Sequence, residues 1–319
     1  LVPLALLLTA ATVLLQGIGR LGDKTYVEQV RLQPTETGLT CLEASLHSGG
    51  TIDTGWGDDI TTNQMISSNG NIDAQSNNST ITGDAWAVGT IVGDVTGTTY
   101  ASQSPPKEMP GSSALDYYIN MGTTIDITAL PFSFGSYRLE KLVLSPQSNP
   151  FGTPNAEGIY VIDCAGSGIK VRNLRVQGTL VLLDPAWGSA VDEEVLFEPA
   201  VSNFPTLLVR GDLYLAHNQN LLDETAEGVN FNPVGTPYEG SEDGDTSDTY
   251  PSVVRGLVYM SGKHDRAFIT STVEGVIVSA TMDANASLNL TYSSIFLNSP
   301  PPGFASGSEM QIIPGSWTR

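Results

Sequence analysis

The apolar positions of this chain follow two different periods, and the change between them comes near residue 48. The chain opens with LVPLALLLTAATVLL and carries no charged residue before Arg20. From Tyr26 to Leu46, apolar residues recur every three or four positions, which is the spacing of one face of a helix. We therefore expect a long N-terminal α-helix over residues 1–48, apolar at its start and amphipathic after Arg20.

Beyond residue 48 the pattern changes to short alternating runs with glycine at their ends, among them GIYVIDC, GIKVRNLRVQGTLVLLD, GLVYMSG and GVIVSA. Strands this short bury a face only when they are stacked on one another. From Gly256 to Gly275 is 19 residues, which suits one coil of a parallel β-helix with three short faces. A β-sandwich is the alternative, but no NG or DG turn directly joins the runs quoted above. The expected fold is mainly β: a helical stalk followed by a parallel β-helix (solenoid).

Three stretches depart from the repeat and predict loop excursions from a β-helix domain that spans residues 49–304. They are residues 103–157, 185–204 and 218–251. Residues 305–319 are expected to form a C-terminal tail. Long loops on a solenoid usually project from one face and often form its contact surface.

The composition restricts the classes of partner. Charged residues make up 15% of the chain and the net charge is −20. Such a surface repels nucleic acid and anionic lipid and attracts cations. The two cysteines, Cys41 and Cys164, fit one disulfide in an oxidising compartment, and two buried free thiols are the alternative. Two cysteines and three scattered histidines do not favour zinc.

An acidic loop is the one candidate for a metal site. Oxygen ligands at alternating positions around Gly244 suit Ca²⁺, although the spacing is not that of an EF-hand, and a solvated acidic loop is the alternative. The candidate ligands are Glu242, Asp243, Asp245 and Asp248. Sequons at Asn77, Asn78, Asn285 and Asn289 are candidate glycosylation sites. No other cofactor is expected.

The candidate catalytic residues do not form a recognisable motif. Parallel β-helices can host polysaccharide lyases and hydrolases, which need carboxylates and a base or arginine on neighbouring coils. The residues that could supply such a cluster are Asp163, Asp184, Asp212, Arg172, Arg175 and Arg210. Asp163 and Asp212 lie beside glycine corners, where aspartate is common for turn reasons alone. We expect no enzyme activity and no catalytic residues.

The N-terminal segment carries a family resemblance. The run LVPLALLLTAATVLL followed by YVEQVRLQPTETGLTCLEASL resembles the N-terminal helix of type IV pilin-like proteins, especially minor pilins. A processed N-terminus that keeps its apolar segment fits prepilin cleavage better than signal-peptide removal. The resemblance implies an assembly helix that packs on its neighbours through Leu1, Leu4, Leu7, Leu8, Val13, Leu14, Ile18, Val27, Val30 and Leu39. Ala5 stands where such pilins carry a glutamate. The stretch GLVYMSG to PPPGF is similar to the C-terminal β-helix of large pilin-like exported proteins of planctomycete-type bacteria.

These expectations lead to a structural role. The first hypothesis is a subunit of an extracellular pilus-like filament at the cell surface, which polymerises with itself or with other pilins and displays an acidic β-helix domain outward, for adhesion or as a surface structure. Before assembly it would be anchored in the inner membrane. The alternatives are a minor pseudopilin of a secretion or pilus machine, and a membrane-anchored β-helix protein that binds or cleaves surface glycans. Nucleic acid is not an expected partner.

Overall fold

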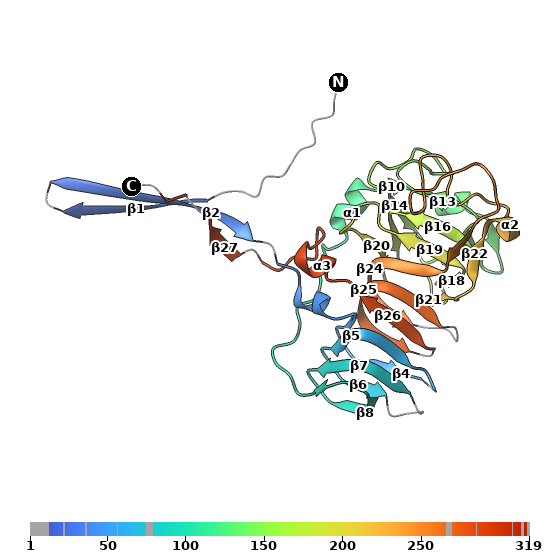
Figure 1. Cartoon of the computed structure of the whole chain (residues 1–319), viewed down its shortest axis with the longest axis horizontal. Coiled ribbons are helices and arrows are strands. Elements are labelled where there is room, and N and C mark those ends of the chain that lie inside the picture. Colours follow the sequence, from blue (N-terminus) through green and yellow to red (C-terminus); the bar gives the residue numbers. More distant parts are fainter. Residues whose placement is uncertain are drawn as a thin grey trace, which may run out of the picture.

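The computed structural model of the chain describes residues 13–21, 23–35, 37–55, 57–74, 79–265, 270–284, 286–307, 309–313 and 316–317. It consists of a narrow antiparallel ribbon and a large head of parallel strands (Figure 1). The predicted positions Leu1, Leu4, Leu7, Leu8, Asn77, Asn78 and Asn285 lie outside the described residues.

The predicted N-terminal helix, and with it the fold class, is wrong. Residues 13–35 form two antiparallel strands, β1 (Val13–Leu21) and β2 (Lys24–Thr35), which pair from Val13–Leu32 to Leu21–Lys24. The third strand of the ribbon is β27 (Glu309–Ile312), which pairs with β2. In the described part of the chain the longest helix, α1 (Asp116–Met121), has 6 residues, and no helix is long and apolar enough to cross a membrane.

The head is a large parallel sheet that closes on itself as a solenoid with three faces. Where no excursion lies between them, strands from successive coils pair at intervals of about 20 residues, as Ile159 does with Thr179 and Gly256 with Gly275. The first face contains β10 (Thr123–Thr124), β14 (Ile159–Asp163), β17 (Thr179–Leu183), β20 (Pro205–Arg210), β24 (Val253–Asp265), β25 (Ser271–Ala284), β3 (Leu46–Ser48), β5 (Ile60–Ser68), β7 (Thr80–Ala87) and β9 (Thr99–Tyr100).

Several of these strands bend at a corner and also contribute to the other two faces. The second face adds β12 (Ser136–Glu140), β15 (Gly168–Arg172), β18 (Ala190–Glu193), β21 (Leu213–His217), β4 (Ile52–Thr54), β6 (Ile72–Ala74) and β8 (Ile91–Val95). The third face adds β13 (Val143–Leu144), β16 (Leu174–Gln177), β19 (Val195–Glu198) and β26 (Leu288–Tyr292). The short strand β11 (Phe132–Ser133) pairs antiparallel with β12.

The order of the coils along the axis is not the order of the sequence. The chain enters the solenoid in the middle at β3, forms the lower coils down to β9, and returns through residues 103–122 to the other end. From β10 it then descends until β25 and β26 pair with β3, β4 and β5, as Ile277 does with Leu46 (Figure 1). The first and last segments therefore leave the head together at its waist.

The apolar core fills the interior of the solenoid. Inward side chains of all three faces form one buried cluster, to which Leu46, Ile66, Leu180, Val258 and Ile277 belong. A second cluster lies outside the first face, beneath α1, η1 (Thr40–Glu43) and α3 (Ile295–Asn298). The remaining short helices are η2 (Ile127–Ala129) and α2 (Glu224–Glu227).

The predicted excursions differ in how far they leave the ladder. Residues 218–251 leave it and carry α2 with the hairpin of β22 (Leu221–Asp223) and β23 (Thr249–Pro251). Residues 185–204 include β18 and β19, which are ladder strands of the second and third faces. Residues 103–157 include β10, β12 and β13, which form the end coil.

Candidate functional site

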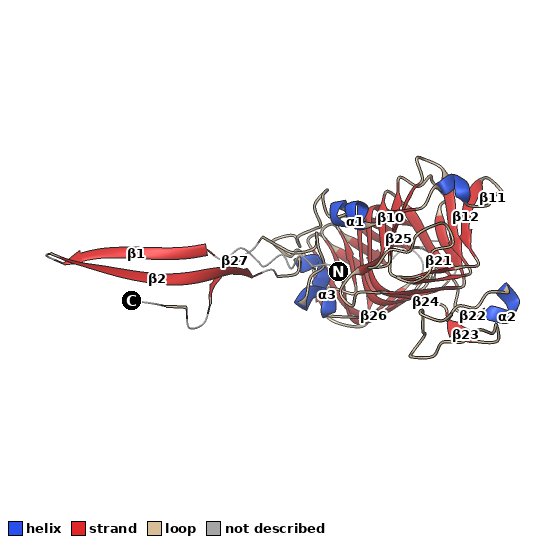
Figure 2. Ribbon diagram, turned by 90° about the horizontal axis from the view of Figure 1, so that it is seen from above, coloured by secondary structure: helices blue, strands red, loops and turns tan. Residues whose placement is uncertain are grey.

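The ribbon presents an open sheet edge. The strand order is β1-β2-β27, so within the described residues one edge of β1 has no strand beside it. Ile18 of β1 lies opposite Val27 of β2, and these side chains are 66% and 37% exposed. An exposed apolar cross-strand pair beside an open edge is the arrangement that favours pairing with another chain. Figure 2 shows the ribbon extending away from the head.

A neck joins the ribbon to the head by pairing both ends of the chain. The Gly38 amide donates to the Leu297 carbonyl at 3.2 Å, and the Leu39 amide donates to the Phe304 carbonyl at 3.0 Å. A β-carbon at Gly38 would lie 2.6 Å from the Leu297 oxygen, so this close approach requires glycine. Phe304 is buried and its ring lies edge-on to Tyr259 of the first face. The neck therefore fixes the ribbon to the middle of the solenoid.

The described residues predicted for an assembly helix are divided between two strands and the neck. Val13, Leu14 and Ile18 lie on β1, while Val27 and Val30 lie on β2. Val30 is buried, and Leu39 lies in the neck as part of the cluster outside the first face. Of this set, the structure places Ile18 and Val27 together on the exposed part of the ribbon.

The acidic loop uses its carboxylates for its own hydrogen bonds. Glu242 accepts from the Gly235 amide at 2.8 Å, and Asp248 accepts from the Asn232 side chain at 3.0 Å. Asp245 accepts from the amide and hydroxyl of Ser247. Among the residues that the structure describes, no group of three or more acidic, histidine or cysteine side chains could hold a metal ion. Calcium binding by Glu242, Asp243, Asp245 and Asp248 remains a prediction.

The predicted disulfide does not form. Cys41 and Cys164 are free, buried thiols. Cys164 belongs to the core inside the solenoid, whereas Cys41 belongs to the cluster outside the first face. Burial raises the pKa of each thiol to about 12, which keeps both protonated and unreactive.

The candidate carboxylate and arginine cluster is spread over separate faces. Arg210 Nη2 donates to Asp184 Oδ2 at 2.6 Å, and this hydrogen bond holds the pKa of Asp184 below its usual range. Arg172 instead pairs with carboxylates of the second face. Arg175 is buried beneath the 218–251 excursion, where it donates to backbone carbonyls. Asp163, Asp184 and Arg210 lie together on successive coils at the end of the first face, apart from Arg172 and Arg175.

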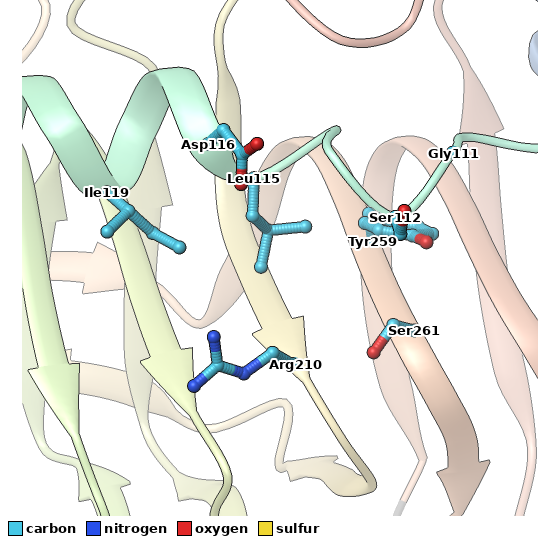
Figure 3. Close-up of a pocket in the computed structure, with 8 residues that line it drawn as sticks. All are labelled: Gly111, Ser112, Leu115, Asp116, Ile119, Arg210, Tyr259 and Ser261. Carbon is cyan, nitrogen blue, oxygen red and sulfur yellow. The ribbon is translucent and has the colours of Figure 1, made fainter.

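A small hollow lies between α1 and the first face, close to Arg210 (Figure 3). Its water-accessible volume is about 170 Å³, and Leu115 and Ile119 contribute apolar lining from α1 and the residue before it. The guanidinium of Arg210 is engaged by Asp184. The hollow is therefore best described as a packing gap under α1.

A larger hollow on the second face combines aromatic and charged groups. Its volume is about 320 Å³. We call it the aromatic cleft, and it is lined by Lys170, Trp187, Gly188, Ala190, Asp192, Glu193, Tyr214 and Ala216. Trp187 is 84% exposed, and its ring meets that of Tyr214 edge-on with 6.3 Å between centroids. The sequence reasoning missed this cleft, although Trp187 between proline and glycine in an excursion was a usable signal.

Asn289 is the candidate glycosylation site within the described residues. It lies in β26 on the third face, in the ladder between Thr272 and Thr61, and is half-buried. Its modification remains a prediction.

No family model matches the chain, and no curated protein matches it. Among solved structures, it is similar to the competence-associated pilin ComZ from Thermus thermophilus, with 12% identity and a TM-score of 0.36. The alignment covers 96% of this chain and 80% of that one.

Proposed function

We propose that this chain is a non-catalytic structural subunit of an extracellular, pilus-related assembly at the cell surface. The ribbon would join it to further copies or to other pilin-like subunits, and the solenoid would be displayed outward. The observation that carries this proposal is the ribbon itself, in which both ends of the chain build an extended element separate from the head (Figures 1 and 2). In this proposal the ribbon, instead of the predicted N-terminal helix, joins the subunits.

Strand addition is the physical mechanism that we propose for joining. A ribbon of two or three strands has little hydrophobic core, so its stability in water is marginal on its own. Pairing the free edge of β1 with another strand would satisfy its open amide and carbonyl groups and place a cross-strand side chain beside Ile18. The net charge of −20 makes neighbouring subunits repel one another. An extended ribbon would reduce this repulsion, because it separates the heads.

Sedimentation velocity and electron microscopy of three purified proteins would test this proposal. The natural chain should form dimers or filaments as its concentration rises. The double variant Ile18→Lys/Val27→Lys should remain monomeric, because lysines on and beside an edge strand repel one another across the new strand pair and oppose strand addition. Phe134→Lys is the matched control, since Phe134 is a 97% exposed aromatic residue on the head, and it should assemble like the natural chain. Equal assembly of the double variant, or a natural chain that stays monomeric at all concentrations, would exclude the ribbon as the joint.

A further inference from the structure

We propose that the aromatic cleft is a binding site for a neutral polysaccharide, with the indole of Trp187 as the platform on which a sugar ring stacks. This inference is independent of how the subunit assembles. It rests on three properties of the cleft: an exposed aromatic side chain on a hydrogen-bonded backbone turn, a floor of small residues, and charged hydrogen-bonding groups that are paired with one another.

The backbone that carries Trp187 is held on both sides while the side chain stays exposed. The Ala186 amide donates to the Ser167 carbonyl at 3.0 Å, and the Ser189 amide donates to the Ala186 carbonyl at 3.1 Å. The Tyr214 amide of the next coil donates to the Ser189 carbonyl at 3.0 Å. Apart from its edge contact with Tyr214, this indole is 84% exposed on a hydrogen-bonded turn, so it contributes little burial to the fold and its face is open to a ligand.

Small residues leave the space beside this indole. In the parallel ladder Ala190 pairs with Lys170 on one side and with Tyr214 on the other. Since neighbouring strands are about 4.8 Å apart, Lys170 and Tyr214 begin roughly 10 Å from each other with only a methyl group between them. Ala216 leaves a similar gap beside Asp192. The resulting volume of about 320 Å³ lies at the lower end of the range for ligand pockets, roughly 300–1,000 Å³.

The polar groups of the cleft suit hydroxyl groups rather than a charged ligand. Lys170 Nζ lies 3.6 Å from Asp192, and Arg172 donates to Asp192 at 2.9 Å and also to Glu193. The two lining carboxylates are therefore paired with cations, Lys170 from the lining and Arg172 from outside it, and these ion pairs hold the side chains in place. Their remaining donor and acceptor positions match sugar hydroxyls, which both donate and accept. The net charge of −20 repels polyanions, so the ligand class is a neutral glycan.

Affinity electrophoresis with soluble polysaccharides tests the site. The natural chain, Trp187→Ala, Trp187→Phe and the control Phe134→Ala would each be run in gels that contain hydroxyethyl cellulose, dextran, xylan, mannan or polygalacturonate. We expect at least one neutral polysaccharide to retard the natural chain. Trp187→Ala should weaken that binding at least tenfold, Trp187→Phe should retain most of it, and Phe134→Ala should not change it. Both substituted positions are exposed, so folding is preserved.

Three results would overturn the proposal. One is the absence of retardation by every neutral polysaccharide. The second is retardation that Trp187→Ala leaves unchanged, and the third is equal or stronger retardation by polygalacturonate. If Trp187→Ala instead alters sedimentation of the chain alone while retardation is absent, the indole belongs to a contact between copies, and the glycan site is rejected.

Discussion

The ribbon and the solenoid are both built from strands, yet they differ in how those strands are supported. A solenoid strand such as β17 has a strand on each side and buries Leu180 and Leu182 in a continuous core. In the ribbon, β1 has a strand on one side within the described residues, and Ile18 is 66% exposed. The comparison teaches that stacking of coils buries the strands of the head in a core of their own, whereas the described strands of the ribbon keep an open edge and exposed apolar side chains.

The largest expected loss of stability in the head comes from a substitution at Gly275. A β-carbon there would lie 1.8 Å from the Gly256 carbonyl oxygen of the coil above, and the ladder cannot move apart to admit it. Gly275→Ala should lower the free energy of unfolding by about 4 kcal/mol or more, measured by urea denaturation. Gly244→Ala, where a β-carbon meets nothing within 4 Å, is the control and should change it little. Similar midpoints for the two variants would contradict the ladder register.

Leu46 tests whether the two halves of the solenoid form one cooperative unit. It pairs with Ile277 at the junction where the first coil of the chain meets the last, and it is fully buried. Leu46→Ala should cost about 3 kcal/mol and keep a single unfolding transition. The control is Leu221→Ala at a 58% exposed site, which should stay within about 0.5 kcal/mol. A second transition in the variant would mean that the halves are independent.

Arg175 tests how the 218–251 excursion is attached to the third face. Its buried guanidinium donates to the carbonyls of Phe231, Thr236 and Pro237 and pairs with Glu198. Arg175→Met should cost about 2 kcal/mol and increase hydrogen exchange in residues 229–238. Arg210→Met, which removes an exposed ion pair, should cost less than about 1 kcal/mol. Unchanged exchange in the excursion would show that other contacts hold it.

His47 makes the stability of the head depend on pH. Burial, with a smaller contribution from Lys107, lowers its pKa from 6.5 to about 3. The imidazole of the unfolded chain therefore binds a proton near pH 6.5, whereas that of the folded chain binds one only near pH 3. The contribution of neutral His47 to the free energy of unfolding is complete above pH 6.5 and is lost as the pH falls toward 3. The slope from this residue approaches about 1.4 kcal/mol per pH unit. His47→Asn should give a shallower pH dependence of the urea midpoint between pH 6.5 and 4.5, and an unchanged slope would contradict the assignment.

The strands of the head were more accessible to sequence reasoning than those of the ribbon. Each coil repeats its own local signal, alternating side chains and a glycine corner, so the 19-residue step from Gly256 to Gly275 is visible in the sequence and is present in the ladder. An apolar start and the helical spacing from Tyr26 onward favour a helix at the N-terminus, but Gly17 and Gly19 weaken one, and opposite apolar pairs such as Ile18–Val27 stabilise a hairpin. The coil order could not be predicted, because a repeat does not specify which coil lies beside which.

The candidate sites also divide into features that local sequence indicates and features that only long-range packing determines. The acidic loop and the arginines were visible as residue types, but their partners depend on long-range packing. The aromatic cleft needs Trp187 and Tyr214 on adjacent coils, and the ladder register sets that adjacency by pairing Ala190 with Tyr214. The coil between Trp187 and Tyr214 does not have the regular length of about 20 residues, so the repeat alone does not predict that these two residues are neighbours.

Site-specific cross-linking measures most directly whether the ribbon is the joint between subunits. In a twofold antiparallel pairing of two β1 edges, the middle of each strand lies beside its own copy. Ile18→Cys should therefore give a covalent dimer in high yield with a short thiol-to-thiol cross-linker, because the native thiols Cys41 and Cys164 are buried. Phe134→Cys on the head should stay monomeric under the same conditions. Equal dimer yields for the two variants, or a higher yield through position 134, would contradict assembly through the ribbon.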